Sequence, residues 1–196
     1  MPRSKRRSRP ERVPTVDPLL QEMLDEHQLR KLVHGYCRAV DRGDLDVVKS
    51  LYHRDAEDAH GAFSSGSVDD LVGQLAAARP YLRSMQHNIT TVNFAISGSA
   101  AEGEIYTIAT HTLDAGDRDV DVIVGGRYLD KYEKRSGTWK FSARTIVTDW
   151  AHVYDPSAVE FGHPITRNTP RGRPDGDDPS RRFFSLLGIA EPAEPQ

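Results

Sequence analysis

The apolar positions of the first 80 residues follow a helical period. Between Leu20 and Asp41 they recur at steps of three and four residues, which is the pattern of an amphipathic helix. The stretch "LDVVKSLYH" repeats this pattern after Asp44, a residue that can cap a second helix. A third helix is predicted for "SVDDLVGQLAAAR", which begins with Ser67 and Asp70 at the spacing of a capping box and ends before Pro80.

After the third helix the period changes to that of a strand. In "HNITTVNFAISG", Val92, Phe94 and Ile96 alternate with other residues, and the same rhythm recurs in "GEIYTIATHTL", "VDVIVGGRYLDKYEK" and "TWKFSARTIVTDW". Short turns separate these four stretches, so an antiparallel meander is predicted. Helices followed by strands indicate an α+β fold, in which a curved sheet packs on the helices and encloses a pocket.

The two ends of the chain differ in composition from the middle. Residues 1–12 carry six Lys and Arg against one Glu, and this local charge of +5 leaves −8 for the rest of a chain whose net charge is −3. The acidic remainder argues against nucleic-acid binding and favours a disordered basic tail. From about Asp155 onward Pro, Gly and Asp are dense, and only "FFSLLGI" is apolar enough to dock, for example on a neighbouring subunit. We expect tails at 1–18 and 156–196 around one domain at 19–155.

Length and composition fit a single hydrophobic core, with 196 residues of which 37% are hydrophobic. The lone cysteine, Cys37, rules out a disulfide framework and makes a reducing compartment the default. No apolar run approaches the roughly 18 residues needed to span a bilayer, and the N-terminus lacks the apolar segment of a secretory signal. The sequence therefore predicts a cytoplasmic protein with neither a membrane nor a nucleic-acid partner.

The eight histidines invite a search for a metal site. No Cys-x-x-Cys, no His-Glu-x-x-His and no helical pair of histidines four residues apart appears, so the zinc signatures are absent. No glycine-rich phosphate loop follows a strand either, because "VGGRY" lies inside a predicted strand, where glycines permit a bulge. We expect chemistry without a metal or a cofactor.

Asp41 is an awkward residue in the predicted pattern. It ends the first helix, where the macrodipole is negative and a carboxylate costs roughly 0.3–1 kcal/mol. One explanation is a surface turn beside Gly43, where aspartate is common. The other explanation is that the Asp41 carboxylate takes part in catalysis.

Three stretches carry a resemblance to a known family: "YCRAVDRGDLDVVKSLYHRDAE", "MQHNITT" and "GGRYLDKYEKRSGTWKFSAR". Together with the order of elements, they resemble the SnoaL-like branch of the nuclear-transport-factor-like superfamily over about residues 19–155. Within that branch the scytalone dehydratase, bile-acid 7α-dehydratase and hexachlorocyclohexane dehydrochlorinase families, all lyases, are the most similar. The resemblance implies a cone, in which a strongly curved sheet wraps around three N-terminal helices and the pocket lies inside.

The resemblance also implies a catalytic pair. It assigns the family's aspartate to Asp41 and the family's histidine to His87, at the start of the first long strand. Asp41 would orient the imidazole and stabilise its protonated form, and His87 would act as the base. A histidine with an ordinary pKa near 6.5 can accept a proton at neutral pH, and such positioned transfer contributes roughly 10²–10⁴ in rate.

Three more residues are implied by the same likeness. Tyr36, five residues before Asp41, matches a tyrosine of the bile-acid enzyme that could donate its phenolic proton, although it also lies on the apolar stripe of the first helix. His111 corresponds to the second histidine of scytalone dehydratase, and it either reaches the pocket or faces solvent. Arg144 matches an arginine of the dehydrochlorinase pocket that could hold an anion, but its strand position also allows it to point outward.

Some residues are placed only by their position at the predicted rim. Asp149, Trp150 and Tyr154 end the last strand and are candidates for contact with a substrate. His60, near the end of the acidic stretch "RDAEDAHG", could line the pocket too, although a loop residue is the alternative.

Three functions fit these observations. The first is a cofactor-independent lyase, of dehydratase or isomerase type, that acts on a hydrophobic and cyclic small molecule through Asp41 and His87. The second is a non-catalytic small-molecule binder, and the third is a partner like the small subunit of ring-hydroxylating dioxygenases. The Asp and His pair favours the first. A curved sheet with a partly apolar outer face predicts a homo-oligomer, and the likeness favours a trimer over a dimer.

Overall fold

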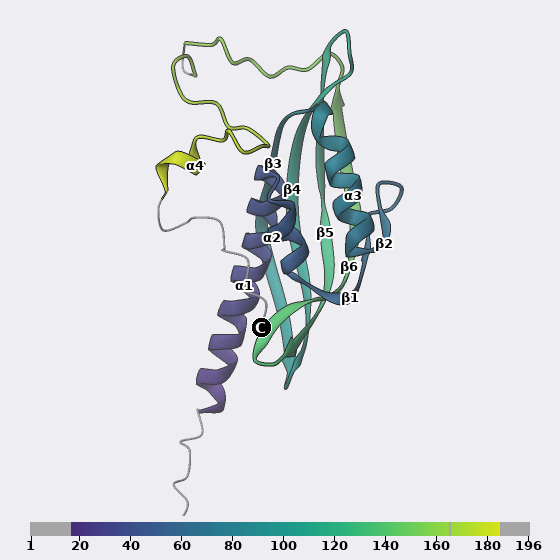
Figure 1. Ribbon diagram of the computed structural model, residues 1–196, viewed down its shortest axis with the longest axis vertical. Helices are drawn as coiled ribbons and strands as arrows, with labels where there is room; N and C mark the ends of the chain where they lie inside the picture. The colour runs from purple at the N-terminus through teal and green to yellow at the C-terminus, as the bar shows by residue number, and fades with distance from the viewer. Residues whose placement is uncertain (1–16, 165, 185–196) are drawn as a thin grey trace, which may run out of the picture.

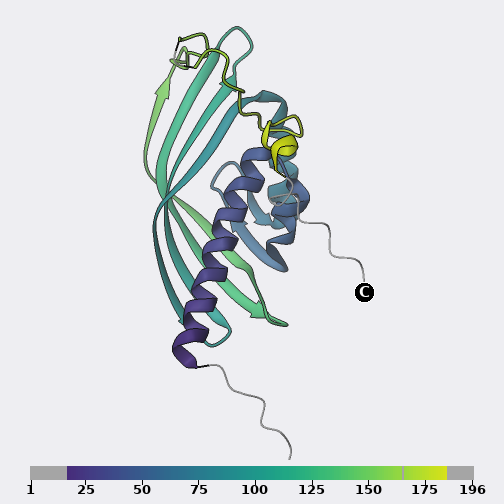
Figure 2. The same ribbon diagram turned by 90° about the vertical axis from the view of Figure 1, so that its left-hand side faces the viewer.

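The computed structural model describes residues 17–164 and 166–184, and it shows helices packed on one side of a curved sheet (Figures 1 and 2). The sheet is six-stranded and open, and its order is β2-β1-β6-β5-β4-β3. The predicted α+β fold is therefore confirmed. The elements are α1 Pro18–Arg42, α2 Leu45–Ser50, β1 Tyr52–Ala59, β2 Ser65–Ser67, α3 Val68–Ala78, the 3-10 helix η1 Arg79–Tyr81, β3 Leu82–Ser97, β4 Ala100–Asp114, β5 Asp119–Arg135, β6 Thr138–Tyr154 and α4 Ser180–Phe183.

Helix α1 is bounded by strong local signals at both ends. The Asp17 side chain accepts the backbone N–H of Leu19 at 2.9 Å, and Pro18 occupies the first helical position, where its missing N–H costs nothing. The helix ends at Gly43, which adopts the left-handed conformation with a φ of 63°. From Leu29 onward its apolar stripe is buried, whereas Leu20 and Leu24 near its start are 49% and 44% exposed, and Asp41 lies in its last turn as predicted.

Strands β3 to β6 form the predicted antiparallel meander. The pairing between β5 and β6 slips between Gly125 and Gly126, so the glycines of "VGGRY" sit at an irregularity of the sheet. The capping box of α3 is also present, because the Ser67 hydroxyl accepts the N–H of Asp70 and the Asp70 carboxylate accepts the N–H of Ser67.

The predictions for residues 51–61 were wrong. The second helix ends at Ser50 rather than His53, and the stretch expected to be an acidic loop is largely strand β1, which pairs in parallel with β6. Its register is interrupted between Tyr52 and Glu57. That irregularity and the many charged residues conceal the two-residue period from a hydrophobicity pattern. Asp44 precedes α2, but its side chain makes no capping hydrogen bond.

The described part of the C-terminal stretch packs against the end of α1 (Figure 2). Arg181 donates to the carbonyl of Arg42 at 2.9 Å and also pairs with Asp44, while Arg42 Nε lies 3.4 Å from the buried Asp178. The Phe183 side chain is 82% exposed, and most of "FFSLLGI" lies outside the described residues. The expected basic tail also lies outside them, apart from Asp17 and Pro18.

No helix among the described residues is long and apolar enough to cross a membrane.

Candidate active site

A cavity of about 480 Å³ lies between the helices and the sheet. Its wall is mostly apolar and includes three histidines, which come from different parts of the chain: His60 after β1, His87 on β3 and His111 on β4. A mostly apolar cavity with a few convergent polar groups is the usual form of a small-molecule site. The other lining residues are Tyr36, Val40, Phe63, Leu75, Ala78, Leu82, Met85, Thr107, Ala109, Leu113, Val122, Val124, Gly126, Tyr128, Ile146 and Val147.

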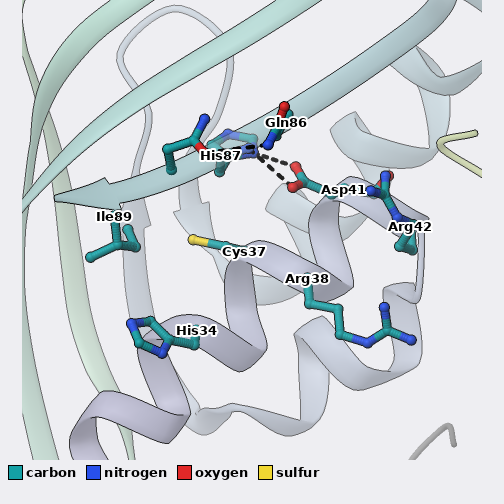
Figure 3. A pocket seen from close by; sticks show the side chains of 9 residues that line it. His34, Cys37, Arg38, Asp41, Arg42, Gln86, His87 and Ile89 are labelled. Atoms are coloured by element: carbon teal, nitrogen blue, oxygen red, sulfur yellow. Dashed lines mark hydrogen bonds and ion pairs between the residues drawn. The ribbon is translucent and has the colours of Figure 1, made fainter. Parts of the chain in front are cut away.

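His87 and Asp41 form a doubly hydrogen-bonded pair (Figure 3). The Nδ1 atom of His87 lies 2.6 Å from one carboxylate oxygen of Asp41, and the backbone N–H of His87 donates to the other at 3.0 Å. The carboxylate thereby fixes the ring of His87 as well as its backbone. With Nδ1 donating to a carboxylate, the neutral ring carries its lone pair on Nε2. Within residues 17–164 and 166–184, Nε2 of His87 has no hydrogen-bond partner.

The pair explains how a carboxylate is accommodated at the end of α1. Asp41 is 6% exposed and lies at the negative end of the helix dipole, where solvent cannot offset the repulsion. The two N–H groups of His87 supply that compensation from the neighbouring strand. Asp41 is therefore not the exposed turn residue that the sequence left as one explanation.

His111 lies beside His87 on the cavity wall. The two rings are nearly perpendicular, at 83°, with centroids 5.5 Å apart. Burial, with a smaller contribution from the neighbouring His87, lowers the pKa of His111 to about 4. His111 is consequently a neutral imidazole at neutral pH, which can donate or accept a hydrogen bond without adding charge. The sequence left open whether His111 reaches the pocket or faces solvent, and in the structure it lies on the cavity wall.

Tyr36 and His60 meet on the wall of the same cavity. The Tyr36 hydroxyl lies 3.3 Å from Nε2 of His60, and both residues line the cavity. Burial raises the pKa of Tyr36 well above its ordinary value, against the opposing effect of the Arg144 cation, so the phenol keeps its proton at neutral pH. Tyr36 also packs edge-on against Tyr52, Tyr128 and Phe141, so it is both a core and a cavity residue.

The partner of His60 was missed by the sequence analysis. Asp58 is buried, its carboxylate pairs with Nδ1 of His60, and it accepts the Tyr52 hydroxyl at 2.8 Å. The available signal was the two-residue spacing of Ala56, Asp58 and His60, which puts all three on one face of a strand. It was overlooked because two of the three are polar.

Arg144 is neither solvent-exposed nor on the cavity wall. Its side chain is fully buried and makes a two-pronged ion pair with Asp130, with both distances 2.7 Å. The guanidinium carbon also lies 4.2 Å from the ring centroids of Tyr36 and Tyr128. Arg144 thus supports the residues that line the cavity, and the sequence-based assignment of substrate contact is not matched by its position.

Trp150 and Tyr154 do not line this cavity. They are 44% and 46% exposed, and the Trp150 ring covers Gly125, where a Cβ atom would come within 2.0 Å of it. Asp149 pairs with Arg127 at 3.0 Å. The rim prediction failed because Trp150 and Tyr154 pair with Gly125 and Asp121 of β5, which alternate with the cavity-lining Val122 and Val124 and so belong to the other face of the sheet.

Asp41 and His87 also line a smaller and more polar hollow of about 360 Å³ (Figure 3). Its wall includes His34, Cys37, Arg38, Asp41 and His87. His87 therefore borders both spaces.

Burial raises the pKa of Cys37 to about 12, so the thiol is not a nucleophile at neutral pH. Within residues 17–164 and 166–184, no three potential metal ligands gather in one place.

Comparisons with known proteins agree on the family and the fold. The model of the SnoaL-like domain matches residues 21–145. Among solved structures, a candidate scytalone dehydratase from Novosphingobium aromaticivorans is similar at 18% identity and a TM-score of 0.63, covering 77% of this chain and 99% of that chain. A type 2 hexachlorocyclohexane dehydrochlorinase is similar at 18% identity and a TM-score of 0.65, and the match covers 74% of this chain and 97% of that chain. The type 3 enzyme from Novosphingobium barchaimii is similar at 21% identity and a TM-score of 0.62, and the match covers 74% of this chain and 99% of that chain. A search of curated proteins found no match.

Proposed function

The chain belongs to the SnoaL-like domain family, and we propose that it is a cofactor-independent lyase whose base is His87, oriented by Asp41. Its substrate is a hydrophobic, ring-bearing small molecule from which a proton and a leaving group are removed. The observation that carries this proposal is the 2.6 Å contact between Asp41 and Nδ1 of His87, because it leaves Nε2 as the basic atom at an apolar cavity.

The first chemical step is abstraction of a proton from carbon by Nε2 of His87. The imidazolium that forms lies against the Asp41 carboxylate, which offsets the new positive charge without moving. His111 cannot compete for that proton at neutral pH, because its pKa is about 4. A neutral His111 instead donates or accepts a hydrogen bond at a substrate oxygen that gains charge in the transition state.

Tyr36 is the donor to a second substrate oxygen. Its hydroxyl keeps its proton at neutral pH, and its ring is held by three aromatic neighbours, so it can act as an acid from a fixed position. The names of the similar structures support this class of reaction, since a dehydratase removes water and a dehydrochlorinase removes hydrogen chloride.

The proposal is tested by turnover of a panel of cyclic ketones that carry a leaving group β to the carbonyl. We expect wild-type protein to accelerate elimination, and His87→Ala to lose roughly 10²–10⁴ of that acceleration. The control is His27→Gln, which replaces an exposed histidine on α1 and should retain full activity. Acceleration that survives His87→Ala would contradict the proposal, and tight binding of the ketones without turnover would favour a non-catalytic binder.

We also propose that the protein is a homo-oligomer, with a trimer favoured over a dimer. Large apolar residues remain exposed on the sheet, including Tyr106, Ile108, Leu129 and Trp150 at 37% to 44%. Monomers rarely leave contiguous apolar surface of several hundred Å² uncovered. Light scattering at micromolar concentration should give three times the chain mass, and a stable monomer would contradict this proposal.

A further inference from the structure

A second carboxylate–histidine pair, which the proposed base does not use, reaches the cavity wall through its histidine. Asp58 and His60 pair through Nδ1 of the ring, as Asp41 and His87 do, but Nε2 of His60 meets the hydroxyl of Tyr36. The Asp58 side chain is fully buried and is held in turn by the Tyr52 hydroxyl at 2.8 Å. The His60 side chain is 18% exposed and lines the cavity.

We infer that His60, positioned by Asp58, is a second acid–base residue of this site, and that it delivers a proton through Tyr36 to an oxygen of the substrate. This inference rests on the proposed function and extends it to the leaving group. His87 would take a proton from carbon, and His60 with Tyr36 would give one to oxygen.

The arrangement of contacts supports a relay. In its protonated form His60 carries a proton on each nitrogen, one facing the Asp58 carboxylate and the other facing the Tyr36 oxygen. The fully buried carboxylate offsets the charge of that imidazolium. A phenol that gives its own proton to the substrate can be reprotonated at once along the existing hydrogen bond, so no phenolate has to persist in the apolar core.

The step balances without another reactant. Nε2 of His87 accepts the proton from carbon, the electron pair of that C–H bond forms the new double bond, and the bond from carbon to the leaving oxygen breaks. The leaving oxygen takes the proton of Tyr36, Tyr36 takes the proton from Nε2 of His60, and water departs. Solvent then takes a proton from His87 and returns one to His60.

The relay predicts which leaving group the site favours. Hydroxide is a poor leaving group and must be protonated as the bond breaks, whereas chloride departs as an anion and needs no acid. A site that holds a proton donor in the same cavity as its base is therefore suited to removal of water or of an alcohol. The inferred substrate class is a cyclic molecule with a hydroxyl group β to an acidic C–H bond.

The test compares two leaving groups on one substrate. Rates are measured for the β-hydroxy and the β-chloro form of the same cyclic ketone, with wild type, His60→Gln and Asp58→Asn, and the spontaneous rates are subtracted. We expect the ratio of hydroxy to chloro elimination to fall by about 10²-fold in His60→Gln and by less in Asp58→Asn. His87→Ala should slow both substrates together and leave the ratio unchanged, and His27→Gln should change neither rate.

The outcomes separate the two proposals. An unchanged ratio in His60→Gln, whether both rates fall or neither does, overturns the relay and leaves the role of His87 intact. Absence of turnover with either substrate in wild type contradicts the proposed function. In that case ¹⁵N spectra of the imidazole rings decide the inference: we expect neutral His60 to carry its proton on Nδ1 and its Nε2 signal to shift in Tyr36→Phe. A proton on Nε2 with no shift would overturn it.

Discussion

Among the buried carboxylates that pair with a cation or a potential cation, Asp130 and Asp41 have different roles. Asp130 holds Arg144 with two contacts of 2.7 Å and also accepts the Tyr132 hydroxyl at 2.6 Å. Asp41 holds the ring and backbone of His87. Both carboxylates are at most 6% exposed, so burial does not distinguish them.

The two carboxylates, Asp130 and Asp41, are distinguished by the side chains with which they pair. A guanidinium keeps its proton under all ordinary conditions, and Arg144 is enclosed by aromatic rings, so this pair can only support structure. An imidazole can lose and regain a proton, and His87 borders the cavity. A buried charge pair therefore indicates chemistry only when its partner can exchange a proton next to open space.

The largest expected effect on stability comes from breaking the ion pair between Asp130 and Arg144. Arg144→Met leaves the Asp130 carboxylate buried without its cation, which should cost about 3–5 kcal/mol of unfolding free energy. Urea unfolding of the variant measures this loss. The double variant Arg144→Met with Asp130→Asn should recover a large part of it, because no uncompensated charge remains. A loss below about 1 kcal/mol would show that the pair is not a structural support.

The next effect is a dependence of stability on pH that comes from His111. Its pKa is about 4 in the folded protein, against about 6.5 for an ordinary histidine, so the unfolded chain binds the proton more readily. The stability that depends on neutral His111 is complete above about pH 6.5 and is lost as the pH falls towards 4, by roughly 2–3 kcal/mol.

Urea unfolding of wild type and His111→Leu between pH 4 and 7 measures this contribution as the difference between the two pH profiles. His27→Gln serves as the control, because that exposed side chain should leave the profile of the wild type unchanged. Identical profiles for wild type and His111→Leu would contradict the lowered pKa.

A smaller effect is expected where the C-terminal stretch meets the end of α1. Arg181 contacts the Arg42 carbonyl and the Asp44 carboxylate from a partly buried position, so Arg181→Ala should lower the unfolding free energy by about 1 kcal/mol. The neighbouring Arg182 is exposed, and Arg182→Ala should change it by less than about 0.5 kcal/mol. Equal melting temperatures for the two variants would show that the contact contributes nothing.

The sequence predicted the elements whose hydrophobic period is long and regular. Helix α1 and the four strands from β3 to β6 were found because each repeats its pattern over many residues. Strand β1 was missed because His53 and Asp58 occupy buried positions of the strand where a hydrophobic pattern expects apolar residues. Its pairing with β6 joins segments some 90 residues apart, which no local pattern reveals.

The site was predicted unevenly for a similar reason. The resemblance led to Asp41 and His87, which the fold brings into contact across 46 residues. Arg144 was assigned to the pocket because a strand position alone does not show whether a side chain has a buried partner, and its partner Asp130 lies on the adjacent strand. Two-residue alternation gives the face of a residue but not its neighbours across the sheet.

The most direct test of the account is Asp41→Asn, with activity and melting temperature measured on the same variant. An asparagine can still accept the backbone N–H of His87, but its amide N–H₂ would favour the tautomer in which Nε2 carries the proton, so the base is lost. We predict a loss of roughly 10²–10⁴ in rate with a change of at most about 1 kcal/mol in stability. Asp46→Asn, on the exposed first turn of α2, is the matched control and should keep full activity. Full activity in Asp41→Asn would contradict the assignment of His87 as a base oriented by Asp41.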